Sequence, residues 1–245
     1  MHYAYFIWSL ALLGIWGLVY GILKDREGRR EMLLVSLWSL PLGLFEWFFV
    51  PPYWSPPTLF DLAVRTGFDI ETFIFAFAGG GIVAVLYEIV VPSRHVLVGA
   101  HERQHPRHRY HWLVLSSGPA LFIALLLASD MNPIYALIMA PVVTGILTWY
   151  CRPDIKGKML AGALLFFALY FVYFWSLVLV FPDYVAQVWN LAAISGILMA
   201  GIPLEELMFA FSVGFLWSSI YEHVKWRRLE WARPRENAAP LGGTR

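Results

Sequence analysis

The chain has 245 residues, of which 59% are hydrophobic and 14% are charged, with a formal net charge of +1. Soluble domains have about 45–50% apolar and about 25% charged residues, so this composition indicates an integral membrane protein. The balanced charge identifies no partner, and we expect none among nucleic acids. The single cysteine, Cys151, excludes an internal disulfide.

Seven apolar stretches are long enough to cross a bilayer, which takes roughly 17–25 helical residues. In chain order they are Tyr3–Leu23, Met32–Val50, Ile70–Val91, Trp112–Ser129, Pro133–Tyr150, Met159–Phe181 and Leu204–Tyr221. We therefore predict an all-α polytopic bundle of seven transmembrane helices, forming one membrane domain over residues 1–245. A further apolar segment, residues 185–201, is interpreted as an interfacial or re-entrant helix on the outer side.

Lysine and arginine gather in alternate connections between these stretches. The connections after the first, third, fifth and seventh stretches are basic, beginning with "KDREGRRE" and ending with "KWRRLEWARPR". The other connections contain only Arg65 among Lys and Arg. Basic loops face the cytoplasm in membrane proteins. We therefore expect the N-terminus outside, a basic cytoplasmic tail over residues 227–245, and a location in a prokaryotic cell membrane. If residues 185–201 formed an eighth crossing, the basic tail would lie outside instead of in the cytoplasm.

Two parts of the chain repeat each other. Gly67–Glu88 aligns without gaps onto Gly201–Glu222, and eight of the 22 aligned positions are identical. A Pro–aromatic exit, "FFVPPYW" or "LVFPDY", ends the stretch before each copy. This pattern predicts two three-helix repeats, over residues 1–92 and 133–226. The stretch at 112–129 joins them and makes them parallel.

Acidic residues begin both copies. Glu71 and Glu205 occupy equivalent places in the first turn of their predicted helices, Glu206 follows directly, and Glu46 lies near the outer end of the second stretch. Burial favours a neutral acid, and the approach of a second carboxylate raises one pKa further. One acid would then hold a proton while another carboxylate accepts one, which is the equipment for acid–base chemistry. Helix capping at the membrane interface is the structural alternative.

Aromatic residues surround the same end of the predicted bundle. Phe75 and Phe209 lie four residues beyond Glu71 and Glu205, and therefore on the same helix faces. Aromatic faces can stabilise a cation through their quadrupole. The candidate substrate-binding residues are Phe75, Phe77, Phe209, Phe211, Trp54 and Trp175. Plain helix packing and an interfacial aromatic belt remain alternatives.

Other polar residues favour structural roles. Glu88 and Glu222 lie 17 residues beyond Glu71 and Glu205, at the inner interface, where we expect them to pair with basic residues. The loop histidines lack a tight pattern of cysteine or carboxylate ligands, so we predict a solvated basic loop and no metal; they are His101, His105, His108 and His111. No nucleotide-binding motif is present, and no lysine lies within the last stretch for a retinal Schiff base.

The motif "GIPLEELMFAF", at Gly201–Phe211, resembles the Pro-x-Glu-Glu-x-x-Phe element of the integral-membrane lycopene cyclase family in its fused two-repeat form. The first repeat departs from it, since "DIETFIF" has Asp69 for the proline and Thr72 for the second glutamate. The resemblance implies redox-neutral ring closure of a linear carotenoid by an intramolecular isomerase or lyase without a cofactor. An acid would protonate the terminal double bond, and a carboxylate would deprotonate the cyclised cation.

The resemblance implies that Glu205 and Glu71 form the pair that donates and accepts the proton, in either order. Glu206 and Glu46 would support this pair. Two other functions remain open. A secondary transporter or lipid-binding membrane protein also has parallel repeats and intramembrane acids. A cyclase for C50 carotenoids would share the scaffold. The expected partners are therefore the bilayer and a linear carotenoid.

Overall fold

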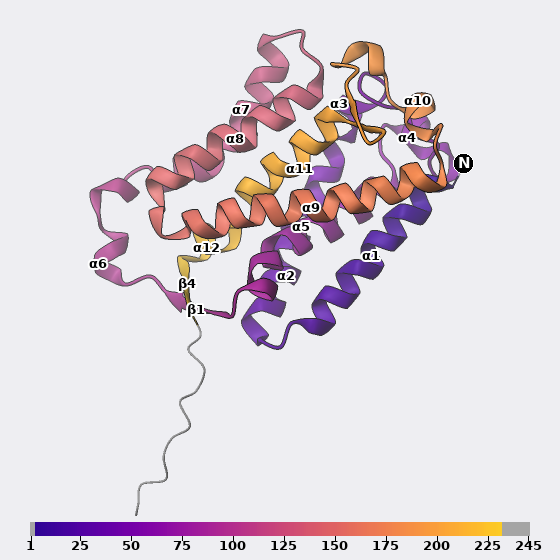
Figure 1. The fold of residues 1–245 in the computed structure, drawn as a ribbon. Coiled ribbons are helices and arrows are strands. Elements are labelled where there is room, and N and C mark those ends of the chain that lie inside the picture. Colours follow the sequence, from indigo (N-terminus) through magenta and orange to yellow (C-terminus); the bar gives the residue numbers. More distant parts are fainter. Residues whose placement is uncertain (1–2, 232–245) are drawn as a thin grey trace, which may run out of the picture.

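The computed structural model describes residues 3–231, and most of them are helical (Figure 1). Within this part, six helical segments are long and apolar enough to cross a membrane. They are Ala4–Ile22, Arg26–Phe49, Ile70–Val90, Pro106–Ala128, Pro133–Cys151 and Pro153–Val180. The first six predicted stretches are therefore confirmed as helices of spanning length.

The second spanning segment begins six residues before its predicted start at Met32. It comprises α2 (Arg26–Ser39), a 3-10 turn (Leu40–Phe45) and α3 (Glu46–Phe49). The Asp25 side chain accepts a hydrogen bond from the Gly28 amide at 3.2 Å, which caps α2. The hydropathy of the sequence did not indicate residues 26–31 as part of the span, because most of them are charged. One of these charged residues, Glu31, is nevertheless fully buried.

The first half of the fold is centred on α5 (Ile70–Val90), which packs against both α1 (Ala4–Ile22) and α2. Asp69 caps α5 by accepting a hydrogen bond from the Thr72 amide at 2.6 Å. A short 3-10 turn (Leu59–Asp61) and α4 (Leu62–Thr66) form the loop that leads into it. This loop lies at the same end of the molecule as α3 (Figure 1).

Close packing of α2 on α5 depends on glycine. A Cβ atom on Gly81 would overlap the Ser36 hydroxyl and lie 3.0 Å from the Met32 carbonyl oxygen, whereas one on Gly79 would meet nothing within 4 Å. Overpacking a tight contact costs about 1–3 kcal/mol. We expect Gly81→Ala to lower the thermal unfolding midpoint in detergent.

Gly79→Ala is the matched control, since alanine raises helix propensity at both sites. It is expected to leave the midpoint the same or higher. Equal midpoints for the two variants would show that α2 and α5 are not in close contact at Gly81.

The second half of the fold also consists of packed helices. The helix α7 (His111–Ala128) packs on α8 (Pro133–Cys151), and α11 (Leu204–Trp217) packs on both α8 and α9 (Lys156–Val180). Before these helices, α6 (Ala100–Arg103) and 3-10 turns (Pro106–His108, Pro153–Ile155) form the connections. The helix α5 also contacts α9, so the two halves join through these helices.

The predicted interfacial helix over residues 185–201 is wrong beyond its first turn. Only α10 (Tyr184–Val188) is α-helical, and a 3-10 turn (Leu191–Ala193) follows. The strands β2 (Leu198–Met199) and β3 (Ile202–Pro203) then form a tight antiparallel hairpin. Its turn has φ values of 52° at Ala200 and 81° at Gly201, and a right-handed helix cannot contain them.

The predicted seventh span is divided into two helices. α11 has 14 residues, and α12 (Ile220–Lys225) has six. The Ser219 amide and hydroxyl both donate to the Leu216 carbonyl, at 3.3 Å and 3.1 Å, which competes with regular helical hydrogen bonding. The expected single crossing helix at Leu204–Tyr221 is therefore wrong in its continuity.

A two-stranded sheet lies at the opposite end of the molecule from α3 and α10 (Figure 1). β1 (Ser93–Leu97) pairs antiparallel with β4 (Arg227–Trp231), and Ser93 lies opposite Trp231. The all-α prediction therefore missed this element, since β4 falls on the first part of the predicted tail. The rest of that tail, residues 232–245, lies outside the described residues.

Candidate active site

An elongated cavity of about 350 Å³ runs through the described part of the bundle. Glu206 and Leu216, both on α11, line it. Ten helical residues separate them, so the cavity extends at least about 15 Å along the helix. Its lining is mostly aliphatic and aromatic, and Glu46 and Glu206 are the carboxylates among the lining residues. The cavity can therefore take an elongated apolar molecule with one end against these acids.

Glu206 is the most extensively hydrogen-bonded group at this end. Its Oε1 atom accepts hydrogen bonds from Tyr53 Oη at 2.7 Å and Trp189 Nε1 at 3.0 Å. Its Oε2 atom accepts one from Tyr170 Oη at 2.5 Å. An ionised carboxylate only accepts hydrogen bonds, so three donors suit the anion and offset the cost of its burial.

Two loops that are distant in sequence position these donors. The Asn190 amide donates to the Tyr53 carbonyl at 2.9 Å, and the Ser55 amide donates to the Val188 carbonyl at 2.8 Å. Between these bonds, Trp54 and Trp189 form an isolated β-bridge with their ring centroids 5.2 Å apart. The loops after the second and sixth predicted stretches are thus tied together over the end of the cavity.

Glu46 lies on the other side of this tryptophan pair. It begins α3 and is 5% exposed. Its Oε1 atom accepts a hydrogen bond from Trp54 Nε1 at 2.8 Å, and the Thr72 side chain is a second hydrogen-bond partner. Glu206 binds Trp189, and Trp54 packs on Trp189, so the two carboxylates are linked through the two indoles. The cavity end therefore has two buried carboxylates in unequal surroundings.

Glu71 and Glu205 occupy a different position. Both are almost fully buried, but neither lines the cavity. Each accepts a hydrogen bond from an amide of the loop before it: Leu59 donates to Glu71 at 2.7 Å, and Ser195 donates to Glu205 at 2.9 Å. Tyr135 Oη also donates to Glu205, at 2.9 Å. These equivalent glutamates hold the loops that cover the acidic end.

The aligned position one residue later faces the cavity in both copies. Thr72 and Glu206 are equivalent in the repeat, and both line the cavity. Thr72 Oγ1 is hydrogen-bonded to Tyr5 Oη at 2.8 Å. The first copy therefore has a hydroxyl group where the second has a carboxylate.

The candidate aromatic residues are divided among several environments. Phe75, Phe209 and Trp54 line the cavity. Phe211 lines a separate pocket, Phe77 packs with its ring centroid 5.2 Å from that of Trp16, and Trp175 is 41% exposed. Sequence analysis missed Tyr170, because a tyrosine within an apolar stretch gives no signal that separates it from an ordinary core residue.

Asp69 gives the acidic end a titratable group outside the spanning helices. Burial raises the pKa of Asp69 from 3.8 to about 6, and its hydrogen bonds with Thr72 offset only part of this effect. A raised pKa favours the folded state while the group is protonated, so this stability is lost as the pH rises from about 4 through 6.

Asp69→Asn is expected to remove this dependence, because an asparagine oxygen also caps a helix but does not titrate. Thermal unfolding midpoints of the wild type and this variant should agree near pH 4. Above pH 6 the variant should be the more stable protein. A difference that does not change with pH would contradict the assignment.

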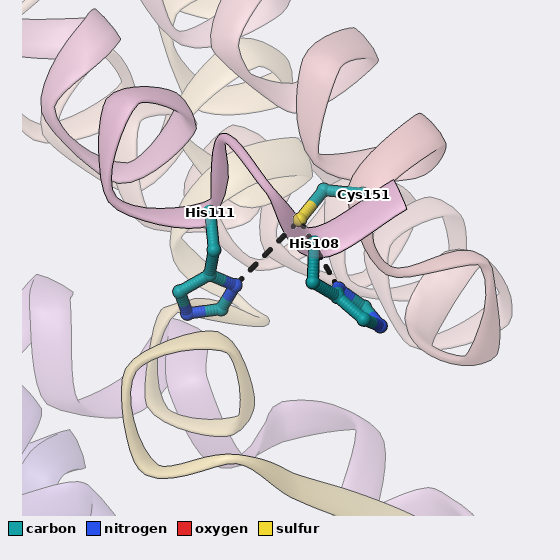
Figure 2. A group of neighbouring side chains, drawn as sticks. All are labelled: His108, His111 and Cys151. Atoms are coloured by element: carbon teal, nitrogen blue, oxygen red, sulfur yellow. Dashed lines mark hydrogen bonds between the residues drawn. The ribbon is translucent and has the colours of Figure 1, made fainter. Parts of the chain in front are cut away.

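The histidine loop is only partly solvated. His101 and His105 are exposed, as predicted, but His108 and His111 are buried beside Cys151 (Figure 2). The solvated-loop prediction is therefore wrong for these two residues. Their burial depends on packing against α8 and Trp226, which are distant in the sequence.

The second half of the chain is similar to a known protein family. A family model described as lycopene cyclase matches residues 132–224, the part that contains α8, α9, α11 and Glu206. No curated protein and no solved structure matches the chain. The chain therefore carries a lycopene cyclase family domain over residues 132–224.

Proposed function

We propose that the protein is a carotenoid cyclase that closes the terminal ring of a linear, lycopene-type polyene by acid–base chemistry. The observation that carries the proposal is an apolar cavity that ends at two buried carboxylates, Glu46 and Glu206. The lycopene cyclase domain over residues 132–224 supports the choice of a carotenoid as substrate. The reaction is a redox-neutral isomerisation and consumes no cofactor.

The unequal surroundings of the two carboxylates support an assignment of roles. Glu206 accepts hydrogen bonds from Tyr53, Tyr170 and Trp189, whereas the partners of Glu46 are Trp54 and Thr72, so the anion is better stabilised at Glu206. Glu46 therefore donates a proton to the terminal double bond, and the resulting cation closes the ring. Glu206 takes a proton from the ring carbon next to the cation. One proton is added and one is removed, so the product is an isomer.

Aromatic side chains support the same step. Phe75, Phe209 and Tyr170 line the cavity, and the Tyr170 ring centroid lies 6.1 Å from those of both phenylalanines. Ring faces in a water-poor cavity stabilise a passing carbocation. Phe77, Phe211 and Trp175 lie outside the cavity lining, so in this proposal they contact substrate only where it extends beyond the cavity.

Glu71 and Glu205 belong to the site as positioning residues. Each accepts an amide hydrogen bond from a loop that covers the acidic end, and this keeps water from a cationic intermediate. The sequence suggested these two as the proton-handling pair. We propose that the roles are exchanged, because the cavity lining contains Glu46 and Glu206 instead.

The proposed membrane arrangement has seven crossings, with α11 and α12 together forming the last. The contacts of α5 with α1 and α2 correspond to those of α11 with α8 and α9, which supports two three-helix repeats joined by α7. The N-terminus then faces outward and the basic C-terminal region faces the cytoplasm of a prokaryotic cell. The linear carotenoid reaches the cavity from the bilayer.

Pigment analysis in a lycopene-accumulating bacterial host tests the proposal. Expression of the chain is expected to convert lycopene to monocyclic or bicyclic carotenoids of the same mass, compared with an empty vector. A second host that accumulates a linear C50 carotenoid tests the alternative chain length. Unchanged pigment in both hosts, with the protein present in the membrane, would refute the proposal.

A further inference from the structure

Two histidines and the single cysteine meet at the end of the molecule opposite Glu206. His108 lies in the 3-10 turn before α7, His111 is the first residue of α7, and Cys151 is the last residue of α8. Their exposed fractions are 7%, 3% and 3%. All three point toward one another (Figure 2), and one ligand atom from each lies within 4.8 Å of the others.

The two sulfur–nitrogen separations match those of a zinc site. Cys151 Sγ lies 3.6 Å from His108 Nδ1 and 3.6 Å from His111 Nδ1. With Zn–S of about 2.3 Å, Zn–N of about 2.0–2.1 Å and a tetrahedral angle, the sulfur and nitrogen ligands lie about 3.6 Å apart. One imidazole nitrogen of each histidine already faces the sulfur, as two ligands of a shared ion would.

We propose that His108 Nδ1, His111 Nδ1 and Cys151 Sγ bind a zinc-type divalent transition-metal ion. One thiolate and two imidazoles suit Zn²⁺ and disfavour Mg²⁺ and Ca²⁺, which prefer oxygen. Three protein ligands leave the fourth tetrahedral position for water. The ion joins the start of α7 to the end of α8, and so closes this helical hairpin at its base.

Neighbouring groups support the ligands. Glu102 Oε1 lies 3.5 Å from His108 Nε2, where a carboxylate can accept the proton that metal binding at Nδ1 leaves on the ring. Without the ion, Arg107 Nε donates to that Nε2 atom at 3.4 Å, so metal binding at Nδ1 would exchange this donor for the Glu102 carboxylate, with which Arg107 also forms an ion pair. The Trp226 ring stacks on His111 with their centroids 4.0 Å apart, which fixes the imidazole plane.

Positive charge near the ion is largely compensated. Arg152, next to Cys151, is 1% exposed and donates to both carboxylate oxygens of Asp154, at 2.8 Å and 2.7 Å. Its Nη1 atom also donates to the Glu222 carbonyl at 2.9 Å. The Cys151 thiolate would itself cancel one of the two charges of the metal ion.

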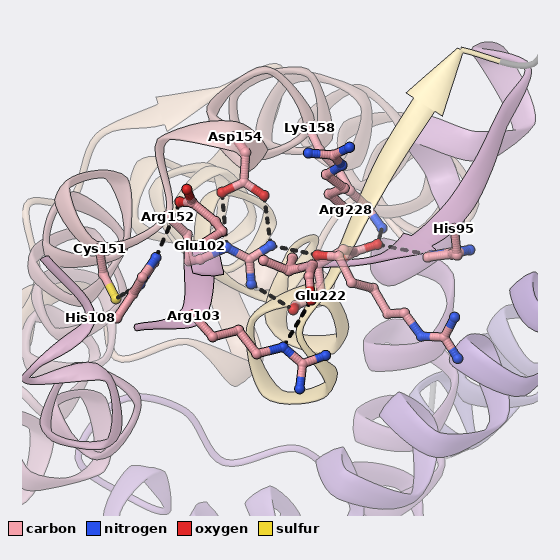
Figure 3. A network of polar contacts seen from close by, with 12 residues as sticks. His95, Glu102, Arg103, His108, Cys151, Arg152, Asp154, Lys158, Glu222 and Arg228 are labelled. Carbon is pink, nitrogen blue, oxygen red and sulfur yellow. Dashed lines mark hydrogen bonds and ion pairs between the residues drawn. The ribbon is translucent and has the colours of Figure 1, made fainter. Parts of the chain in front are cut away.

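A second buried group of possible ligands lies near this site but holds a different cation. Glu31, Glu88, His95 and Glu222 have ligand atoms within 4.8 Å of one another. Lys158 Nζ lies among the three glutamates at 2.7–2.9 Å, and Figure 3 shows it beside Glu222. The ammonium group already occupies the place of an ion there, so that group is not proposed as a metal site.

Cobalt substitution tests the proposal on the full chain, purified in detergent after treatment with a chelator. Titration with Co²⁺ is expected to give a thiolate-to-cobalt charge-transfer band and visible bands of tetrahedral Co²⁺. Both should saturate at one equivalent, and Zn²⁺ should abolish them. Cys151→Ser should lose the charge-transfer band, and His111→Asn should weaken binding at least ~10-fold.

His101→Asn is the matched control, since His101 lies exposed in the same loop. It should bind Co²⁺ as the wild type does. A folded wild type without the charge-transfer band would overturn the proposal and leave Cys151 as a thiol hydrogen-bonded to two imidazoles. The wild-type spectrum decides the question even if Cys151→Ser does not fold. It is also independent of carotenoid turnover.

Discussion

Glu206→Gln is expected to lower ring closure by at least ~100-fold, within the range that a positioned general base contributes. Glutamine has the shape of glutamate but cannot take a proton from the cyclised cation. The measurement is the ratio of cyclic to linear carotenoid in a lycopene-accumulating host, at matched amounts of membrane protein. Linear lycopene should accumulate with the variant even where the wild type converts nearly all of it.

The fold should tolerate this change. The amide oxygen of glutamine can accept from Tyr53 and Trp189, as Glu206 Oε1 does. The amide nitrogen would then face Tyr170, whose hydroxyl group can turn and accept a hydrogen bond. We therefore expect a thermal unfolding midpoint close to that of the wild type, so that loss of activity reports on chemistry.

Glu205→Gln is the matched comparison, because it alters the adjacent residue of the same motif. Its amide oxygen can still accept from the Ser195 amide and from Tyr135 Oη, so the loop stays attached. The loss of ring closure should be much smaller than in Glu206→Gln. The reverse order, with Glu205→Gln inactive and Glu206→Gln active, would restore Glu205 as the proton-handling residue.

The sequence predicts where these glutamates lie in the bundle but not which way each side chain points. Its repeat located the acidic end of the protein, but adjacent residues on a helix point about 100° apart. Nothing local in "PLEEL" indicates whether Glu205 or Glu206 faces the cavity, although both are buried. That is determined by Tyr53 and Trp189, which reach Glu206 from separate loops.

The spanning helices, in contrast, could be predicted from the sequence. A run of about 20 apolar residues must satisfy its own backbone hydrogen bonds in a bilayer, which leaves little alternative to a helix. The elements that sequence analysis missed are determined by other contacts. β1 pairs with β4, more than 120 residues away, and the Ser219 hydroxyl interrupts the last helix by a local hydrogen bond.

The buried charges at the end opposite Glu206 were also only partly predictable from the sequence. Sequence analysis predicted that Glu88 and Glu222 pair with basic residues, and this is confirmed: Lys158 Nζ lies 2.9 Å from Glu88 and 2.7 Å from Glu222. Glu31, at 2.8 Å from the same atom, was not anticipated. These residues come from α2, α5, α9 and α12, so a single ammonium group links both halves of the fold.

His95 supplies the second positive charge. Burial lowers the pKa of His95, but hydrogen bonds to Glu222 and Glu31 outweigh this and raise it to about 10. His95 is therefore protonated at neutral pH and faces the three carboxylates together with Lys158. The cluster thus contains two cations that face three buried glutamates. Removal of either cation would leave buried carboxylates without a compensating positive charge.

Lys158→Met is therefore expected to have the largest effect on stability of any variant considered. Removing one partner of a buried ion pair costs about 3–5 kcal/mol, and here one ammonium group serves three carboxylates. Since whole domains are stable by only about 5–15 kcal/mol, we expect a much lower yield of folded protein in detergent. The measurement is the thermal unfolding midpoint of the purified fraction.

Lys156→Met is the matched control, because Lys156 is exposed on the same helix, with Nζ 5.6 Å from the Trp149 ring centroid. An exposed cation–π contact contributes about 0.5–1 kcal/mol, so this midpoint should change little. Adding Glu31→Gln to Lys158→Met should recover part of the loss, since the double variant removes one carboxylate together with the cation. Equal midpoints for Lys158→Met and Lys156→Met would mean that Lys158 does not hold the two halves of the bundle together.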